Sequence, residues 1–368
     1  MTSIRHVLGI SGGKDSAALA IYLRTRFPKI DVEYYFMDTG KELDETYEFI
    51  DNLAIFLGKK IERLQAASGS PVTPFDHYLE LYGGYLPSAN ARWCTRKLKL
   101  EPFEQFFVGD DPALSYVAIR ADEDRDGLIS HKTNIQTLFP FRRNIWTKDV
   151  MSFIFDAQRA ALFAEVYAEL STVTLRDAGN EIIRRPLGAN FSMLRKANML
   201  LDLSVPIFNH AVFALLRYSL YPVKEMEFYP LLDKDDIIDR DGVFRLLEES
   251  GIGKPKYYEP IEIEVDGKKG FYNRSRSGCF FCFFQQKIEW IWLFERHPDR
   301  FREAMAYEKD GFTWMDDERL EELIQPSRIA SIKKAHLSNK PVNQATKSSY
   351  LVDVLSESEG QGCTVCFI

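Results

Sequence analysis

A glycine-rich loop between an apolar run and a helical pattern constrains this chain most strongly. In HVLGISGGKDSAALAIYLRTRF, residues 6–27, a buried-strand pattern at residues 7–10 leads directly into Ser-Gly-Gly-Lys-Asp-Ser, and a helix is predicted over residues 17–26. The glycines permit a sharp turn and a close approach of backbone N–H groups to a ligand. Because the start of a helix adds partial positive charge, the loop predicts a phosphate-binding site.

The alternation of strands and helices continues along the first part of the chain. This pattern predicts βαβ units and an α/β fold, a doubly wound, Rossmann-like parallel sheet of five strands. A helix is expected within residues 38–58, ending at Gly58. The remaining strands are expected at residues 32–37, 59–65, 114–120 and 136–141. Ligands of such sheets bind beyond the carboxyl ends of the strands, where residues 11–16, 38–40 and 120–123 lie.

The domain organisation follows from a change of pattern near residue 150. The chain has 368 residues, enough for two domains or for one domain with a large insertion. A helix is expected over residues 235–250, closed by Gly251. The expected parts are an ATP-binding α/β domain at 1–150, a helical insertion at 151–227, a C-terminal region of helices and a cysteine turn at 228–325, and a tail at 326–368.

Charge and cysteine content narrow the class of protein. The formal net charge of −7 argues against an extensive basic surface, so direct nucleic-acid binding is expected to be weak. No apolar run approaches the roughly 20 residues of a membrane helix, and the N-terminus lacks the pattern of a signal peptide. These features predict a cytoplasmic protein without membrane contact. In a reducing cytosol, two CxxC pairs among five cysteines indicate a metal-binding or redox function.

The loop SGGKDS resembles the PP-loop motif SGGxDS of the ATP pyrophosphatase, or adenine nucleotide alpha hydrolase, superfamily, whose α/β fold is called HUP-type. It matches neither the Walker A spacing nor the dinucleotide fingerprint. The resemblance implies that the loop grips the β- and γ-phosphates of ATP while a nucleophile attacks the α-phosphate, so that pyrophosphate leaves. The alternative is a glycine-rich turn that only caps a helix. The implied ligands of pyrophosphate and Mg²⁺ are Ser11, Gly12, Gly13, Lys14, Asp15 and Ser16.

Further segments resemble the phosphoadenosine-phosphosulfate (PAPS) reductase branch of this superfamily. These are MDTGKELDET, ARWCTRKLKLEPF, AIRADEDRDG and FYPLLDKDDIIDRDGVFRLLEESGI, and the resemblance covers residues 1–150 and 228–310. The chain departs from the PAPS reductases at its end, because GCTVCFI lacks their Glu-Cys-Gly-Ile/Leu-His nucleophile. Its length and its CxxC after an arginine-rich turn are most similar to the sulfurtransferase of Dnd- and Ssp-type DNA phosphorothioation systems.

The cysteines are the candidate metal ligands. Cys279 and Cys282 have the i, i+3 spacing that places two thiolates on one metal, and Cys94 lies in a basic segment far from them. Three thiolates predict a [4Fe–4S] iron–sulfur cluster with one open iron, which can bind sulfide or a persulfide. Cys363 or Cys366 is an alternative fourth ligand. The two CxxC pairs would also suit a four-thiolate zinc site, or redox and persulfide chemistry without a metal.

The remaining site residues each have two readings. Asp38, with Thr39 and Gly40, is expected to help hold Mg²⁺ or the adenosine, or else caps the following helix. Arg120 is expected to grip a phosphate, or else forms a salt bridge with Asp122 or Glu123. The residues assigned to catalysis are Lys14, Asp15, Asp38, Arg120, Cys363 and Cys366.

The favoured function is that of an ATP pyrophosphatase-type sulfurtransferase. It would adenylate an oxygen of a phosphate acceptor, release pyrophosphate and admit sulfur, as in DNA phosphorothioation. A cysteine desulfurase is the expected sulfur donor, and DNA-handling proteins are expected partners. The first alternative is a sulfonucleotide reductase that releases sulfite, with Cys363 or Cys366 attacking the sulfate sulfur and thioredoxin resolving the product. The second is a non-catalytic ATP-sensing subunit.

Overall fold

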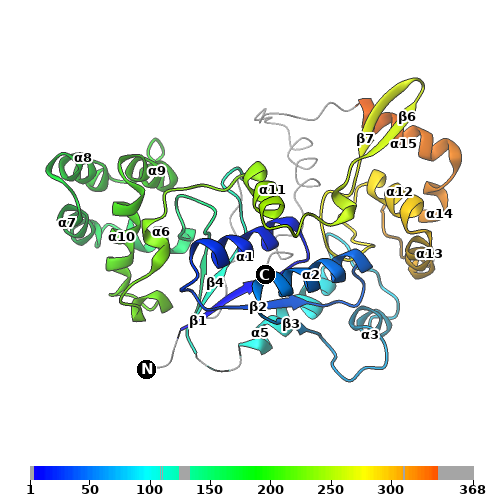
Figure 1. Ribbon diagram of the computed structural model, residues 1–368, viewed down its shortest axis with the longest axis horizontal. Coiled ribbons are helices and arrows are strands. Elements are labelled where there is room, and N and C mark those ends of the chain that lie inside the picture. Colours follow the sequence, from blue (N-terminus) through cyan, green and yellow to red (C-terminus); the bar gives the residue numbers. More distant parts are fainter. Residues whose placement is uncertain (1–3, 108, 110, 124–132, 310, 339–368) are drawn as a thin grey trace.

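The fold is built on a five-stranded sheet, seen in a computed structural model that describes residues 4–107, 109, 111–123, 133–309 and 311–338 (Figure 1). The strands lie in the order β3-β2-β1-β4-β5, and every neighbouring pair is parallel. Their bounds are β1 Arg5–Gly9, β2 Val32–Met37, β3 Ile61–Leu64, β4 Ala113–Tyr116 and β5 Ile135–Leu138. The predicted α/β fold with a parallel sheet of five strands is therefore confirmed.

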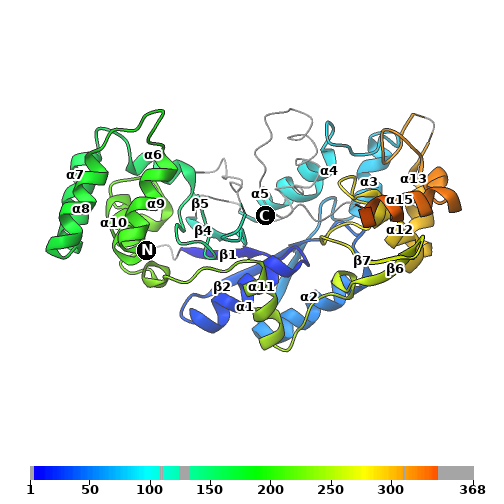
Figure 2. The same ribbon diagram turned by 90° about the horizontal axis from the view of Figure 1, so that it is seen from above.

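Helices cover both faces of the sheet because successive strand residues point to opposite sides. Leu8 of β1 faces a core shared with α1 (Lys14–Arg26) and α2 (Asp44–Leu57), and α11 (Arg240–Glu249) packs on α1. Val7, the preceding residue, faces a smaller core with the phenylalanines of α5 (Glu101–Phe106). Figures 1 and 2 show α1 and α5 on opposite sides of the sheet. Strands β2 and β4 are buried on both faces and are accordingly mostly apolar, whereas the edge strand β3 is largely exposed.

Several element boundaries differ from the expected ones. Helix α1 begins at Lys14 instead of residue 17, and α2 begins at Asp44 instead of near residue 38, because positive φ at Gly40 interrupts the chain first. Helix α11 begins at Arg240 instead of residue 235, because the side chain of Asp239 accepts the Gly242 N–H and caps it. Strand β4 pairs only as far as Tyr116, and β5 as far as Leu138. The predicted closures at Gly58 and Gly251 are confirmed by their positive φ.

The segment after β5 is helical. It contains α6 Lys148–Ile154, α7 Ala160–Leu170, α8 Val173–Arg184, α9 Met193–Leu203 and α10 Val205–Leu216, followed by 3₁₀ turns η2 Pro222–Glu225 and η3 Pro230–Asp233. These helices share the large core of the α1 face, with Trp146, Phe163 and Phe208 among its buried aromatic side chains. The helical segment is therefore continuous with the sheet's own core.

A second large core holds the C-terminal region. Its elements are η4 Lys256–Tyr258, β6 Ile261–Val265, β7 Lys268–Tyr272, α12 Lys287–Arg296, α13 Pro298–Tyr307, α14 Leu320–Leu323 and α15 Pro326–Ser338. The core also takes side chains from α3 (Pro74–Leu81) and the short helices α4 (Trp93–Thr95) and η1 (Arg96–Leu100). The β6–β7 hairpin was not predicted. Helix α15 occupies the start of the segment expected to be a tail.

The helical segment and the C-terminal region lie at opposite ends of the molecule, with the sheet between them (Figures 1 and 2). Within the described part of the chain, no helix combines the length and apolar character needed to cross a membrane.

Candidate active site

The glycine-rich loop turns between β1 and α1 in a conformation that requires glycine at position 12. Gly12 has a φ of +70°, and a Cβ atom there would lie 2.3 Å from Cγ2 of Thr46. A Cβ on Gly13 would lie 2.5 Å from Oγ of Ser277, which belongs to the segment between β7 and α12, residues 273–286, called the cysteine turn. The loop is therefore packed from two sides, and a side chain at position 12 or 13 would force the side chain of Thr46 or of Ser277 to shift.

The two serines of the motif hold the loop in place. The Ser11 N–H donates to Oγ of Ser16 at 3.0 Å, and Oγ of Ser11 accepts the Gly13 N–H at 3.3 Å. Gly13 is the N-cap of α1, so no side-chain oxygen caps the first turn. The open N-terminus of a 13-residue helix therefore adjoins the loop, an arrangement suited to a phosphate group.

A network of opposite charges extends from the loop to Arg120. Asp15 accepts from Nζ of Lys14 at 3.0 Å and from Nη1 of Arg120 at 2.9 Å. Arg120 also pairs with Asp122 at 3.0 Å and with Glu123 at 3.2 Å. Burial by itself would lower the pKa of Arg120, but the carboxylates, Asp15 foremost, raise it. Arg120 therefore stays charged and lies beside the loop. The salt bridges with Asp122 and Glu123, which were the alternative prediction for this arginine, are also present.

The segment after β2 is held by Asp38. Its carboxylate accepts the Gly40 N–H at 2.9 Å, the Tyr47 hydroxyl at 2.8 Å and the Gln65 amide at 2.9 Å. The alternative reading as a helix cap is wrong, because the N-cap of α2 is Leu43. Asp38 thus shapes the turn. Of the three residues predicted here, Thr39 alone lines the cavity described below.

The thiols of Cys94, Cys279 and Cys282 line the same cavity as the loop. Cys94 belongs to α4, and the other two belong to the turn that precedes α12. Sγ of Cys279 lies 3.2 Å from Oγ1 of Thr39 and 3.8 Å from Oε1 of Glu42. Burial raises the pKa of the Cys279 thiol and that of the Glu42 carboxyl. Thr39, which follows the end of β2, therefore contacts the thiol of Cys279.

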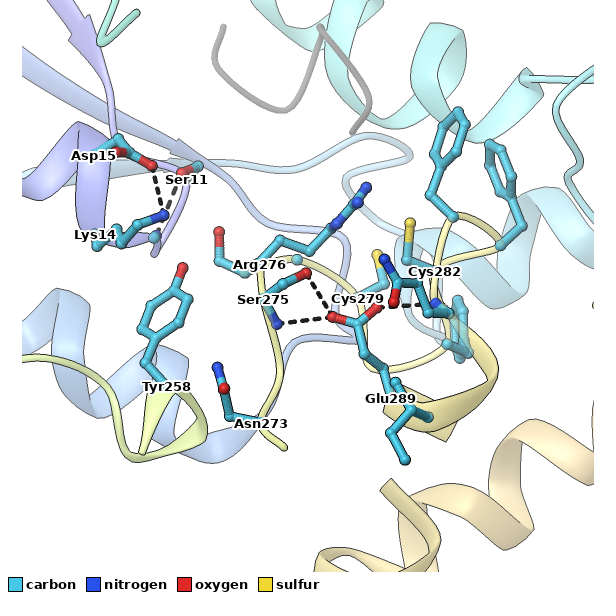
Figure 3. A pocket seen from close by; sticks show the side chains of 18 of the residues that line it. Ser11, Lys14, Asp15, Tyr258, Asn273, Ser275, Arg276, Cys279, Cys282 and Glu289 are labelled. Carbon is cyan, nitrogen blue, oxygen red and sulfur yellow. Dashed lines mark hydrogen bonds and ion pairs between the residues drawn. The ribbon is translucent and has the colours of Figure 1, made fainter. Parts of the chain in front are cut away.

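Buried polar side chains anchor the cysteine turn. Arg274 is 1% exposed and donates to the carbonyl oxygens of Gly278 at 3.2 Å and Cys279 at 2.7 Å. Glu289 of α12 accepts the backbone N–H of Ser275 at 2.7 Å and its hydroxyl at 2.6 Å (Figure 3). These contacts fix the path of the turn before any ligand binds.

The cavity measures about 910 Å³, which is within the range of small-ligand sites. Arg276 lies between the loop and the thiols (Figure 3), and its buried Nη1 has no hydrogen-bond partner among the described residues. Tyr257 donates to the Gly12 carbonyl at 2.8 Å, and the Tyr258 ring lies 5.3 Å from Nζ of Lys14. These tyrosines were not among the predicted site residues, and the β6–β7 hairpin separates them from the cysteine turn in the sequence.

The described thiols do not form a ready metal site. Within the described ranges, no group of three or more histidine, cysteine, aspartate or glutamate side chains is arranged to hold a metal ion. Cys94, Cys279 and Cys282 line one cavity but are not arranged as such a group. Cys363 and Cys366 lie outside the described residues. The iron–sulfur cluster and the zinc site stay predictions.

Comparison with known proteins bears on the α/β part of the chain. Residues 5–140 match the family model of the phosphoadenosine phosphosulfate reductase domain. The matched residues contain the glycine-rich loop and all five strands of the parallel sheet, so this part of the chain is similar to that domain.

The curated relatives are themselves uncharacterized proteins. One from Methanocaldococcus jannaschii is 34% identical over 119 residues, which are 32% of this chain and 23% of that protein. A second from the same organism is 27% identical over 220 residues, 57% of this chain and 47% of that protein. A nin region protein of Escherichia phage lambda is 30% identical over 145 residues, 33% and 49% of the two chains. The chain thus spans less than half the length of each relative. No solved structure matches it.

Proposed function

We propose that the protein is an ATP pyrophosphatase-type sulfurtransferase that adenylates an oxygen of a phosphate acceptor and then admits sulfur. The observation that carries this proposal is the shared cavity: the phosphate-binding loop and three thiols line it together. A nucleotide bound at the loop would therefore place its reacting end near sulfur nucleophiles, as a two-step transfer requires.

In the first step, an acceptor oxygen attacks the α-phosphorus of ATP. The bond from this phosphorus to the oxygen that bridges to the β-phosphorus breaks, and pyrophosphate leaves with the electron pair. The loop N–H groups, Lys14 and the start of α1 would hold the departing phosphates. Arg276, whose Nη1 has no hydrogen-bond partner among the described residues, would face the phosphates or the acceptor. Magnesium carried by the nucleotide would neutralise phosphate charge, with Asp15 and Glu123 as the nearby carboxylates.

In the second step, sulfur replaces AMP. The terminal sulfur of a cysteine persulfide, supplied by a cysteine desulfurase, attacks the activated centre, and the bond to the AMP oxygen breaks. A second thiol then attacks the persulfide bond, which releases the thio-product and leaves a disulfide. An external dithiol reduces this disulfide and is oxidised in turn. Cys279 and Cys282, three residues apart in the cavity, are the candidate pair.

The test follows both products of the reaction. Purified protein is incubated with ATP, a cysteine desulfurase, ³⁵S-labelled cysteine, a dithiol and short DNA, and pyrophosphate, AMP and labelled DNA are measured. We expect Lys14→Ala to abolish release of pyrophosphate, and Cys282→Ser to abolish labelling while pyrophosphate is still formed. Lys29→Ala, at an exposed lysine beyond α1, is the matched control. Release of orthophosphate instead of pyrophosphate would refute the proposal.

The predicted cluster has its own test. Iron and zinc are determined in anaerobically purified protein, together with an absorption spectrum and a Cys282→Ala control. Iron with a broad band near 400 nm, lost in the variant, would support an iron–sulfur site. If the active protein contains no metal, the predicted cluster is refuted and sulfur transfer through a cysteine persulfide remains.

A sulfonucleotide reductase is the second candidate, supported by the match of residues 5–140 to the PAPS reductase domain. A thiolate would attack the sulfur of PAPS or adenylylsulfate, the sulfur–oxygen bond to the nucleotide phosphate would break, and thioredoxin would release sulfite from the resulting thiosulfonate. Its expected nucleophile, Cys363 or Cys366, lies outside the described residues. Release of sulfite from either compound would select this function. ATP binding without turnover of any substrate would select the ATP-sensing subunit.

A further inference from the structure

An exposed phenylalanine lies on the wall of the main cavity, which the glycine-rich loop and the thiols share. Phe271 of β7 lines this cavity and is 62% exposed. Among the described residues it packs in neither of the two large cores. The reaction proposed above gives it no role. A flat apolar ring exposed at a cavity wall can stack on a flat group of a ligand.

Two exposed cations line the same cavity. Arg240 begins α11, and Lys254 follows this helix. Their charged groups lie 6.0 and 5.7 Å from the ring centroid of Phe244, which also lines the cavity, so one apolar ring positions both. Neither cation has an ion-pair partner among the described residues. Both charges are therefore available to an anionic ligand.

The carboxylates of the described lining do not cancel these charges, because each already has a partner. Asp15 and Glu123 pair with Arg120 at 2.9 and 3.2 Å, and Glu289 accepts from the cysteine turn. Asp239, which precedes the first residue of α11, accepts a backbone N–H of this helix. In a chain of net charge −7, this local excess of cations favours an anionic ligand.

The exposed ring is connected along the chain to the reacting part of the cavity. Asn273 and Arg276 follow Phe271 in the sequence and also line the cavity. They lie between Tyr258, beside the glycine-rich loop, and Cys279 (Figure 3). A ligand that lies on Phe271 can therefore continue along this segment to the thiols.

A single nucleic-acid strand combines the groups that this wall would recognise. Its phosphates carry negative charge for the two cations, and its unpaired bases offer flat faces to the exposed ring. In a duplex the bases already stack on one another, so their faces are not free for a side chain. Cations beside an aromatic platform are the combination that binds single strands.

We propose that the acceptor is an unpaired nucleic-acid strand, which lies across Arg240, Lys254 and Phe271 and presents one of its phosphates to the thiol side of the cavity. Naming the strand as the acceptor rests on the proposed function; the strand-binding surface itself rests on the lining residues. DNA and RNA strands offer this same chemistry.

The first test measures the affinity of a fluorescein-labelled octathymidylate by anisotropy. Salt is kept at about 0.1 M, where exposed charges more than about 10 Å apart are largely screened. We expect the double variant Arg240→Glu, Lys254→Glu to bind at least about tenfold more weakly, because it reverses two exposed charges on the wall. The control Arg245→Glu, Lys256→Glu makes the same change at exposed residues outside the lining and should lose less than about threefold.

The second test removes the ring alone. Phe271→Ala should bind the probe at least about fivefold more weakly, because a stacked base loses its platform. Phe228→Ala is the matched control, since Phe228 is 58% exposed and lies outside the lining, and its affinity should not change. Thermal unfolding shows whether both variants are folded.

Competition with unlabelled octathymidylate, octauridylate and duplex DNA identifies the kind of strand. Competition by both single strands shows a site for either sugar, and competition by the DNA strand alone shows a preference for DNA; both support the proposal. Stronger competition by the duplex, equal affinities of the two double variants, equal affinities of the two alanine variants, or no binding of the probe would overturn it.

Pyrophosphate release by the unchanged protein reports the proposed function separately. Strand binding with the expected variant effects in a protein that releases no pyrophosphate would refute only the reaction. Pyrophosphate release by a protein that binds no strand would refute only the strand as acceptor.

Discussion

The two sides of the main cavity are built in different ways. The phosphate side consists of six consecutive residues, Ser11 to Ser16, whose conformation is held largely by hydrogen bonds among themselves. The thiol side joins Cys94 of α4 to the turn before α12, and this turn is held by its own Arg274 and by Glu289 of α12. A site can thus combine a local motif with a part that exists only after distant segments have packed.

The two sides of the cavity are also in direct contact with each other. Ser277 of the cysteine turn packs against Gly13, and Tyr257 donates to the carbonyl of Gly12. A disturbance of either side should therefore reach the other, and variants can measure how far.

The largest effect is expected from Gly12→Ala. Its Cβ would fall 2.3 Å from Cγ2 of Thr46, at a φ of +70°. Strain of this kind costs about 1–3 kcal/mol, and a loop displaced by about 1 Å loses roughly 100-fold in rate. Pyrophosphate release and thermal unfolding are measured together.

The double variant Gly12→Ala, Thr46→Ser separates the two causes. Serine lacks the clashing methyl group, so part of the lost stability should return while the strain of positive φ remains. Wild-type activity in Gly12→Ala would show that the phosphate side does not need its observed conformation.

Arg274 and Arg276 of the cysteine turn provide the next test. One residue separates them in the sequence, yet Arg274 holds the turn by hydrogen bonds and Arg276 has an Nη1 without a hydrogen-bond partner in the described structure. Arg274→Met leaves two carbonyl oxygens of the turn without their donor, at an expected cost of about 2–4 kcal/mol of unfolding free energy. Arg276→Met removes a side chain whose Nη1 has no hydrogen-bond partner in the described structure, so stability should change little while ATP affinity falls. Urea unfolding and ATP titration of both variants make the comparison. Equal losses of stability would contradict it.

A smaller effect concerns the reactivity of Cys279. Burial raises the pKa of its thiol, so at pH 8 the folded protein should hold less thiolate than the unfolded chain. Alkylation by iodoacetamide at this site, followed by mass spectrometry, should be at least about tenfold slower in the folded protein than in urea, since each pKa unit removes a factor of about ten. Equal alkylation rates in the folded and the unfolded protein would show that the Cys279 thiol is exposed to water.

The smallest expected effect is a loss of stability in acid. Glu318 accepts from Nε and Nη2 of Arg328 at 2.8 and 2.7 Å and from Lys287 at the start of α12, and these partners lower its pKa to about 2. Between pH 4.5 and 2 the unfolded chain binds the proton first, so stability falls as the pH falls through this range.

The Glu318→Gln variant is the control, because glutamine has no carboxyl group that could take up a proton. The difference in thermal midpoint between wild type and Glu318→Gln should shrink by about 2 °C from pH 6 to pH 3. A constant difference would show that this ion pair does not stabilise the region that carries the thiols.

Much of the fold and the phosphate side could be predicted from the sequence. Strand and helix periodicities depend on near neighbours, and the parallel sheet followed from their alternation. Because the carboxyl ends of parallel strands meet at one edge, Ser11, Thr39 and Arg120 could be expected together, and they line one cavity. Asp38 departs from this expectation, because its carboxylate accepts from Gly40, Tyr47 and Gln65 and does not line the cavity. Gln65 lies 27 residues away along the chain, so a local sequence pattern does not reveal this contact.

The sequence by itself determined the strand–loop–helix unit and the order of elements around it, since these depend on residues a few positions apart. Only the tertiary structure decided that Cys94 would line the same cavity as the cysteine turn and that Ser277 would pack against Gly13. Each of these arrangements depends on which apolar surfaces of distant segments are buried together, and no short window of sequence contains that information.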